Sequence, residues 1–422
     1  MDDDFDWGAM DEEIDAPPQD EEKNSYLCDY SKGMQLIAGI MGNKRSVSRR
    51  EEGSVSRLDH LIDEDLLDSL KDLEIEDEMS ISRRLRKISD RVEEYKKNKV
   101  LKGKTIIGIG GQFSAGKSAF INSLINDNLL MTDLSVATSI STYLVYGEKE
   151  QIWAFTEENQ KIPLSLEAMQ ALTHDFYRTY KIGFSGFIKN LIVESPAFSN
   201  IGNGNHLVIL DTPGYNNEIN PNKKSSSDYD QARKQLRSVD YLIWLMDCEG
   251  SIPNQGDIDF LRSLNFDKSI LIIINKADKK EGNPESLKSQ AACVEEDFRN
   301  NGITLYGVTC YSSRNGQEYF GNEYIRKFLQ DAELYANNKR SETDELKDIF
   351  PVLRGQLERN RKRNLESLKQ IQKLIANTQD YNAIRSLIEV HKNLMLQKDE
   401  IRECGRNLDK VENRIFREII NL

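Results

Sequence analysis

Several features that mark secreted, membrane-spanning or nucleic-acid-binding proteins are scarce in this sequence of 422 residues. Its five cysteines are odd in number and far apart, without a Cys-X-X-Cys pair, which indicates free thiols in a reducing compartment. No apolar run approaches the roughly 20 residues that cross a bilayer, and the N-terminus is acidic where a secretory signal is basic. We therefore expect a cytoplasmic protein, with peripheral attachment to a membrane as the alternative.

Positive charge is also in short supply, since 57 lysines and arginines face 70 aspartates and glutamates, for a net charge of −13. A nucleic-acid-binding surface needs a basic face to displace the counterions of phosphates, so nucleic acid is not expected as a partner. The four histidines (His60, His174, His206 and His391) are dispersed and indicate neither a catalytic base nor a metal site. Hydrophobic residues make up 38% of the chain, which suffices for two or three units of about 100 to 200 residues each.

The first 50 residues differ in composition from the rest, and we expect them to form an acidic, largely disordered segment. Residues 1–25 carry eleven carboxylates against one lysine, and have too little apolar surface to fold alone. Residues 34–50, MQLIAGIMGNKRSVSRR, place a short apolar patch before basic residues. That patch either touches an anionic membrane or forms a small helix or strand packed on the next domain.

Helical periodicity precedes and follows the middle of the chain. In residues 51–100 apolar side chains recur at i, i+3 and i+4 spacing, which predicts the amphipathic helices of a neck bundle. Residues 341–422 are predicted to be a helical stalk segment, with a heptad seam formed by Leu387, Leu394, Ile401, Leu408, Ile415 and Leu422. The seam belongs either to a bundle with the N-terminal helices or to a stalk that self-assembles, and both interpretations can hold.

Between these helical regions, residues 101–340 alternate short β-branched runs with helical stretches. The alternation predicts an α/β domain with a mostly parallel sheet and helices on both faces. One exception is the pair of runs at 191–196 and 206–210, which surround a Gly/Asn turn and predict an antiparallel hairpin at the sheet edge. The expected architecture is this α/β domain flanked by N- and C-terminal helices that form a bundle or stalk.

The segment GQFSAGKS, residues 111–118, matches the phosphate-loop pattern G-x-x-x-x-G-K-[ST] between a strand and an apolar helix. Small residues let backbone N–H groups turn toward phosphates, and the helix N-terminus adds positive potential. Lys117 should reach the β- and γ-phosphates, and Ser118 should ligate Mg²⁺. The predicted phosphate-binding residues are Gly111, Gln112, Phe113, Ser114, Ala115, Gly116, Lys117, Ser118 and Ala119.

A second strand end, LVILDTPG, supplies a candidate metal-site residue. Asp211 ends this buried run, and its carboxylate should lie opposite Ser118 and hold the metal through water. The backbone N–H of Gly214 should meet the γ-phosphate. The motif therefore predicts a Mg²⁺–nucleotide site shared with the phosphate loop.

A third strand end, SILIIINKAD, predicts the base that the site reads. Asp278 can accept hydrogen bonds from guanine N1 and N2, which adenine lacks, so a wrong base leaves a carboxylate unpaired. Asn275 should tie this loop to the phosphate loop, and the stem of Lys276 should lie along the ring. Ser312 and Ser313 follow the last strand and are candidates to close over the base. The predicted ligand is GTP or GDP.

The segment LLMTDLSVATSISTYLVYG, residues 129–147, resembles the bacterial dynamin-like pattern L-P-T-x-x-x-P-x-T-A-x-x-T-x-x-x-Y-G, with Thr138 on the switch threonine. The phosphate loop GQFSAGKSAFINSLI is similar to that family's G-[EQ]-F-S-x-G-K-S-x-x-I-N-x-L, and DTPG without a following glutamine is also shared. The resemblance covers residues 56–422. Met131 and Val136 replace both prolines of the threonine loop, and Thr132 is the alternative switch residue.

The resemblance implies a dynamin-type GTPase that hydrolyses GTP to GDP and phosphate with Mg²⁺. It implies metal ligation by Ser118, Thr138 and Asp211, catalytic roles for Lys117, Ser114 and Thr138, and dimerisation of two copies through their nucleotide faces. It also implies movement of the helical part at a membrane.

Two departures from other GTPases concern the attacking water. Phe113 stands at the phosphate-loop position where eukaryotic dynamins have glutamine, and Tyr215 replaces the glutamine that small signalling GTPases carry after the switch glycine. Ser114, Thr138 or a backbone carbonyl must then help, with a monovalent cation as a further candidate.

A scaffold that binds GTP or GDP with little hydrolysis, and recruits a partner through its helices, is the alternative function. The missing glutamines favour the scaffold, whereas the complete phosphate, metal and base set favours hydrolysis. Candidate partners are a second copy, anionic membrane lipid and a second dynamin-like protein. The basic runs at 96–104 and 359–363 either meet anionic lipid or, as we favour, pair with the chain's many acids.

Overall fold

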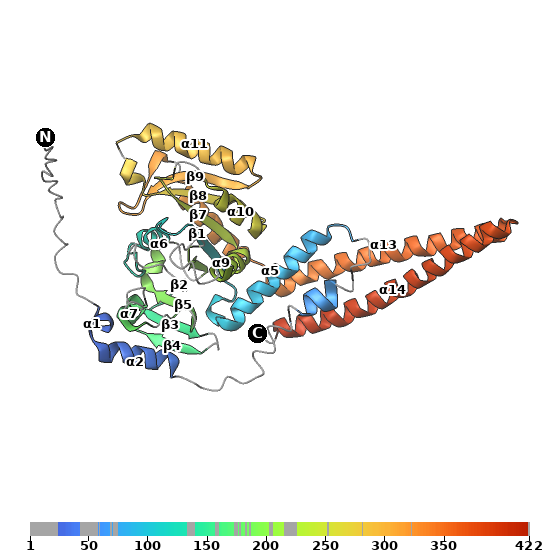
Figure 1. Cartoon of the computed structure of the whole chain (residues 1–422), viewed down its shortest axis with the longest axis horizontal. Helices are drawn as coiled ribbons and strands as arrows, with labels where there is room; N and C mark the ends of the chain where they lie inside the picture. Colours follow the sequence, from blue (N-terminus) through green and yellow to red (C-terminus); the bar gives the residue numbers. More distant parts are fainter. Residues whose placement is uncertain are drawn as a thin grey trace, which may run out of the picture.

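The computed structural model describes residues 24–42, 58, 60–67, 70 and 75–420, except 133–139, 157–159, 173–175, 177–178, 182–183, 185–186, 202–205, 215–225, 251–252, 281 and 322. It consists of an α/β domain from which two long antiparallel helices extend as a rod (Figure 1). Thr138, Tyr215 and Leu422 lie outside the described residues.

Ten strands of the described chain form one sheet in the order β10-β9-β8-β7-β1-β6-β2-β5-β3-β4. β1 lies in the interior of the sheet and pairs in parallel with β6 and β7, and β8 and β9 continue this parallel half. Antiparallel pairs occur on the other side and at the β9–β10 edge. The strands are β1 (Thr105–Gly111), β2 (Ser141–Tyr146), β3 (Gln151–Thr156), β4 (Lys161–Leu164), β5 (Ile188–Ser195), β6 (Leu207–Asp211), β7 (Tyr241–Asp247), β8 (Ile270–Asn275), β9 (Leu305–Ser312) and β10 (Gln317–Glu318).

The predicted hairpin between residues 191–196 and 206–210 is wrong. β5 and β6 do run in opposite directions, but β2 lies between them, parallel to β5 and antiparallel to β6. β6 also pairs with β1, so it lies inside the sheet and not at its edge. The Gly/Asn pattern between the two runs predicts a turn from neighbouring residues alone. The strand that separates them, β2, lies more than 40 residues earlier in the chain.

Helices cover both faces of the sheet, as the alternating pattern predicted. One face is covered by α2, α6, α7 and α12, whose apolar side chains join Ile107 and Ile109 of β1 in one core. α9, α10 and α11 cover the other face, around Ile106 and the fully buried Trp244. The elements of the domain are α1 (Ser25–Cys28), α2 (Tyr30–Met41), η2 (Lys99–Leu101), α6 (Lys117–Ile125), α7 (Leu166–Ala171), η4 (Pro196–Asn200), α9 (Ser226–Ser238), α10 (Gln255–Leu264), η5 (Ala277–Lys280), α11 (Pro284–Asn300), η6 (Tyr319–Gly321) and α12 (Tyr324–Asn338).

A third core holds the helices on either side of the α/β domain together, and we call this region the neck. It contains η1 (Leu61–Leu67), α5 (Glu78–Lys97), α13 (Glu342–Asn377) and α14 (Tyr381–Ile420). Leu408 and Ile415 of the heptad seam are buried there. Ile401 is also buried but lies outside this core, and Leu387 and Leu394 are half-buried farther along the two-helix rod. The seam therefore forms a bundle with the N-terminal helices, as one interpretation of the sequence held.

The expectation of a largely disordered segment is wrong for residues 24–42, which form α1 and α2 against the β3–β4 side of the sheet (Figure 1). Leu36, Ile37 and Ile40 of α2 are buried in the domain core. These side chains give the helix an apolar face that packing can stabilise, unlike the acidic residues before it. The rest of residues 1–50 lies outside the described residues.

All five cysteines are free, as their spacing predicted. Among the helices of the described ranges, none is both long enough and apolar enough to cross a bilayer.

Candidate functional site

The phosphate loop connects β1 to α6 and depends on two glycines with positive φ. Gly111 has φ 141°, and a Cβ atom there would lie 2.3 Å from the carbonyl oxygen of Leu245. Gly116 has φ 82°, and a Cβ atom would lie 2.5 Å from the amide nitrogen of Asn275. Side chains are excluded at both positions by sterics and by backbone conformation, which is why the pattern requires glycine there.

Lys117 begins α6 and is buried beneath the loop. Its ammonium donates to the carbonyl oxygens of Gly111 at 3.2 Å and Gln112 at 3.0 Å. Burial lowers the pKa of Lys117 to about 8, although the carboxylate of Asp211 acts in the opposite direction. A phosphate oxygen would supply the negative charge that this desolvated cation lacks.

Ser118 and Asp211 meet directly at the ends of neighbouring segments. The hydroxyl of Ser118 donates to Asp211 Oδ2 at 2.8 Å, while the buried Oδ1 of Asp211 has no hydrogen-bond partner among the described residues. Burial raises the pKa of Asp211 to about 6, against the opposing effects of Lys117 and Ser118. A buried carboxylate oxygen without a donor, next to a hydroxyl, fits Mg²⁺, which takes few protein ligands and completes its shell with phosphates and water.

The DTPG segment packs onto the phosphate loop. Thr212 donates its hydroxyl to the carbonyl oxygen of Ile109 in β1 at 2.7 Å. A Cβ atom on Gly214 would lie 2.8 Å from both the nitrogen and the Cα of Phe113. The backbone of Gly214 is thus in close contact with the phosphate loop, next to the place where a γ-phosphate is expected.

The NKAD segment is tied to the same loop from the other side. Asn275 donates its amide to the carbonyl oxygens of Ala115 at 3.0 Å and Gly116 at 3.3 Å. Ser313 in turn donates its hydroxyl to Asn275 Oδ1 at 2.8 Å, and Ser312 donates to Asp278 Oδ1 at 2.7 Å. The second of these bonds orients the carboxylate that is predicted to accept from guanine.

The structure thus brings together the phosphate loop from Gly111 to Ala119, the DTPG segment, the NKAD segment and the two serines. Ser114 lies in the loop with φ 63°, which a non-glycine residue adopts only where the surroundings hold it. The predicted switch residue Thr138 lies outside the described residues, and the alternative Thr132 is exposed just before that gap. The catalytic and metal roles of these side chains remain predictions.

Two contacts of the site were not predicted from the sequence. Asp247 ends β7 and binds the ammonium of Lys276, with a distance of 2.6 Å from Nζ to Oδ2. The buried Asp257 at the start of α10 accepts from the side chain of Gln112 at 2.8 Å. A signal existed for Asp247, because the run YLIWLMD ends in aspartate at the same sheet edge as LVILD. Asp257 belongs to no motif, and only the fold brings it to the loop.

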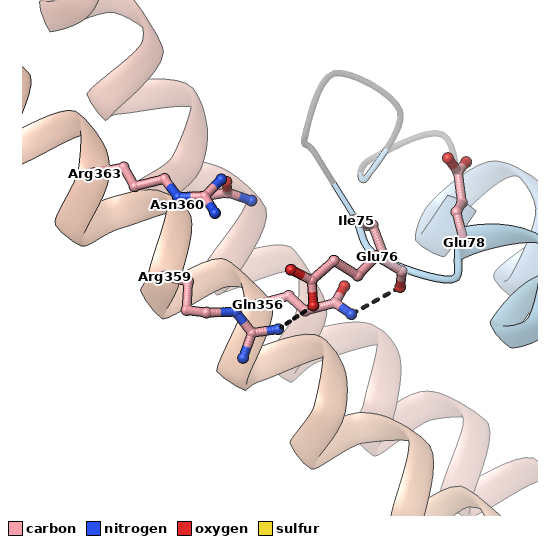
Figure 2. A pocket seen from close by; sticks show the side chains of 7 residues that line it. All are labelled: Ile75, Glu76, Glu78, Gln356, Arg359, Asn360 and Arg363. Atoms are coloured by element: carbon pink, nitrogen blue, oxygen red, sulfur yellow. Dashed lines mark hydrogen bonds and ion pairs between the residues drawn. The ribbon is translucent and has the colours of Figure 1, made fainter.

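A separate cavity of about 480 Å³ lies on the neck, between α13 and the turn before α5 (Figure 2). Gln356 donates its amide to the carbonyl oxygen of Glu76 at 2.8 Å, and Arg359 pairs with the Glu76 carboxylate at 3.3 Å. Arg361 pairs with Glu358 on the same helix. These contacts agree with the interpretation that the basic run at 359–363 pairs with acids, and they fasten α13 to the chain that leads into α5.

A phosphate loop, a Ser–Asp pair and an NKAD segment lie together at one edge of a mostly parallel sheet, which is the arrangement of motifs in P-loop GTPases. A family model described as the Dynamin family matches residues 107–278, which contain all three of these elements. Over these residues the chain is similar to the dynamin family.

Two curated relatives have sequence similarity to this chain. "Dynamin-like protein 1" of Campylobacter jejuni subsp. jejuni is 24% identical over 287 residues, which are 55% of this chain and 38% of that protein. An "Uncharacterized protein in xynA 3'region" of Caldicellulosiruptor sp. is 22% identical over 346 residues, 77% of this chain and 81% of that protein. The chain therefore spans well under half the length of the first relative.

The solved structures that the chain matches share little sequence with it, and their TM-scores are below 0.5. An oligomerised bacterial dynamin pair, described as a mechanism for long-range sensing and tethering of membranes, is 15% identical with a TM-score of 0.39. The match covers 87% of this chain and 54% of that one. Era of Aquifex aeolicus bound to GDP and AlF4⁻ is 15% identical with a TM-score of 0.32, and the match covers 53% and 56% of the two chains.

Proposed function

We propose that this protein hydrolyses GTP to GDP and phosphate with Mg²⁺, and that it does so fastest when two copies meet at their nucleotide faces. The observation that carries the proposal is the convergence at one sheet edge of Lys117, the Ser118–Asp211 pair and Asp278. Each of them addresses a different part of the same ligand, namely the phosphates, the metal and the guanine base. The sharpest test compares the rate of phosphate release from GTP with the rate from ATP.

The residues divide the proposed reaction between them. Ser118 and Asp211 would hold Mg²⁺, and the ion would supply positive charge against the negative charge that develops on the phosphates. Lys117, whose ammonium donates to the carbonyl oxygens of Gly111 and Gln112, is expected to bind the γ-phosphate. The backbone N–H groups of the loop stabilise charge on the phosphates without needing to reorganise. Ser114 remains the described candidate for orienting water, together with Thr138.

A nucleotide-gated scaffold with little hydrolysis is the second candidate function. It is favoured by one observation, namely that Phe113 and Tyr215 stand at the positions where other GTPases carry a glutamine. A site without such a side chain has little means of its own to order the attacking water. The two functions differ in what a second copy does to the rate.

We expect specific GTPase activity to rise with protein concentration. A facing copy would bury the phosphate loop and fix the Thr138 loop, because one protomer alone supplies no obvious group for the water. GDP with aluminium fluoride, which imitates the transferring phosphoryl group, should drive dimerisation, whereas GDP alone should not. Phosphate release over a wide concentration series, and light scattering with each ligand, measure the two effects.

The scaffold predicts neither effect. Activity per molecule that stays flat with concentration, together with a protein that remains monomeric with GDP and aluminium fluoride, would favour the scaffold over the self-activating GTPase.

We propose further that the nucleotide state is transmitted to the neck through α9, the helix that follows the DTPG segment. Arg237 of α9 binds Asp90 of α5 through two nitrogens, at 3.0 and 2.7 Å. Lys234 of α9 binds Glu93 of α5 at 2.6 Å. A shift of the DTPG segment on binding or hydrolysis would therefore act on α5 through these two ion pairs.

β2, which follows the threonine loop, makes a second connection to α5. Tyr143 of β2 donates its buried hydroxyl to Glu94 of α5 at 2.9 Å. Ser141, the first residue of β2, donates to the buried side chain of Gln235 in α9 at 2.6 Å. β2 and α9 thus contact one another, and both contact the same neck helix, α5.

A cluster of buried charges fixes the point where domain and neck meet. Asp240 accepts from the backbone N–H of Ile106 at 2.9 Å and from Lys339 at 2.8 Å. Arg91 of α5 lies 3.8 Å from Asp240 and donates to Glu345 of α13 at 2.7 Å. Burial opposes the ionisation of Asp240, but Lys339 and Arg91 outweigh it and keep the pKa of this carboxyl below its usual value. The cluster joins β1, α5 and α13, and is the expected pivot of neck movement.

Peripheral association with anionic lipid is also proposed, through the outward face of α2. Tyr30, Met34 and Met41 are 71%, 39% and 39% exposed, so the apolar arc of this helix is wider than the face buried against the sheet. Between Asp29 and Glu51 the sequence contains no carboxylate and five cations: Lys32, Lys44, Arg45, Arg49 and Arg50. Apolar side chains beside a cluster of cations are typical of helices that lie on anionic membranes.

We expect the protein to float with phosphatidylglycerol vesicles and not with phosphatidylcholine vesicles. Met34→Asp should abolish flotation, because it places a charge where apolar side chains would enter the lipid. Met79→Asp is the matched control, since Met79 is 74% exposed on α5 and away from this face. Equal flotation with neutral vesicles, or of the Met34→Asp variant, would contradict the assignment.

A further inference from the structure

Lys276 of the NKAD segment is held at its ammonium group. Its Nζ lies 2.6 Å from Oδ2 of Asp247, and the two side chains are 24% and 28% exposed. Asp247 is the last residue of β7 and lies beside Asn275 in the parallel register of β7 and β8. The parallel pairing of β7 and β8 therefore places Asp247, at the end of β7, beside Lys276, which follows β8.

The backbone of Lys276 is held by Cys248, the residue that follows Asp247. Cys248 donates its thiol to the carbonyl oxygen of Lys276 at 3.0 Å. Lys276 has φ 60°, in the left-handed region that non-glycine residues seldom adopt, and a hydrogen bond to its carbonyl helps to keep it there. Asp247 and Cys248 thus fix both ends of this lysine.

The segment that follows β7 is itself anchored from α11. Gln290 donates its side-chain amide to the carbonyl oxygens of Cys248 at 3.1 Å and Gly250 at 2.6 Å. Lys280 donates to the same carbonyl oxygen of Cys248. Asp247 therefore lies between two fixed parts of the domain: the rest of β7 precedes it, and the residues that follow it are bonded to α11.

We propose that Asp247 is a positioning residue of the guanine site, which orders Lys276 so that its aliphatic stem lies along the face of the base. The inference rests on the proposed function, since it concerns the base end of the same site. An extended lysine loses much rotamer freedom when it is ordered on a ligand. The ion pair with Asp247 orders it before the nucleotide arrives, so that less entropy is lost on binding.

The test is the affinity of the full chain for GDP and GTP, measured by isothermal titration calorimetry. Asp247→Asn keeps the shape of the side chain and removes its charge, and should weaken both nucleotides by about fivefold, the size typical of a partly exposed ion pair. The loss should be equal for GDP and GTP, because Lys276 acts at the base and not at the γ-phosphate. In turnover, KM should rise more than kcat falls.

Four further variants, one of them double, separate positioning from a general structural effect. Glu249→Gln is the matched control, since Glu249 pairs with the exposed Lys279 at 2.7 Å in the same segment, and it should leave both affinities unchanged. Asp247→Glu keeps the charge and should retain most of the affinity. Lys276→Ala should weaken binding by itself, and adding Asp247→Asn to it should cause no further loss, because the group that Asp247 positions is gone.

The outcomes are distinct. Unchanged or tighter binding by Asp247→Asn, a loss confined to GTP, or full additivity of the double variant would each overturn the role of Asp247 while leaving the GTPase proposal in place. If the unmutated protein binds neither GDP nor GTP, the proposed function is overturned and this inference with it.

Discussion

GTP turnover is expected to fall by about 100-fold or more in the Lys117→Ala variant, because phosphoryl transfer relies on positive charge placed at the transferring group. Lys117 is the buried cation of the phosphate loop, and its Nζ lies within 3.2 Å of the carbonyl oxygens of Gly111 and Gln112. Phosphate release at saturating GTP and Mg²⁺ measures the effect.

A matched lysine provides the control for this variant. Lys347→Ala removes an ammonium that pairs with the exposed Asp344 on α13, and it should leave turnover within error of the unmutated protein. Unchanged hydrolysis by Lys117→Ala would mean that a different site, or a contaminating enzyme, releases the phosphate.

The second large effect is expected at the junction of domain and neck. Arg91→Met should lower the free energy of unfolding by about 3–5 kcal/mol, since it removes one partner of a buried ion cluster and leaves carboxylates without their counter-charge. The Arg91 side chain is 3% exposed and has Asp240, Glu342 and Glu345 around it. Urea unfolding, monitored by the circular dichroism signal of the helices, measures this loss as a shift in the midpoint of the first transition.

Two further variants, Arg299→Met and the double variant of Arg91→Met with Glu345→Gln, test whether the buried cluster causes the loss. Arg299→Met breaks an exposed pair with Glu295 on α11, a kind of contact worth about 0–1 kcal/mol, and should barely move the transition. Adding Glu345→Gln to Arg91→Met should recover part of the loss, because one unpaired carboxylate disappears. Equal shifts for Arg91→Met and Arg299→Met would show that the cluster does not fix the neck.

The nucleotide site could be predicted from the sequence because its elements are local. Phosphate loops require glycine where the backbone leaves no room for Cβ, as at Gly111 and Gly116, and such requirements are visible in a short pattern. The parallel sheet and the neck bundle were also predictable, the sheet from the alternation of short β-branched runs with helical stretches, and the bundle from helical periodicity and a heptad seam. The link between Asn275 and the phosphate loop followed from the motif order alone.

What could not be predicted depends on distant partners. β2 enters between β5 and β6, and nothing near residues 191–210 signals that insertion. The charge cluster combines Arg91, Asp240 and Lys339, each of which is an ordinary charged residue in its own segment. α2 was only one of two alternatives, because its short apolar run fits lipid and core equally well.

The central claim is that this chain hydrolyses guanine nucleotide at the Lys117–Asp278 site, and phosphate release from GTP and from ATP by the full chain tests it most directly. With Mg²⁺ and protein in the range where dimers form, GTP should be hydrolysed and ATP should not. Asp278→Asn should weaken GTP binding, because guanine N1–H and N2–H lose their carboxylate, and should leave ATP a poor ligand. Equal hydrolysis or equal binding of ATP and GTP by the unmutated protein would contradict the account.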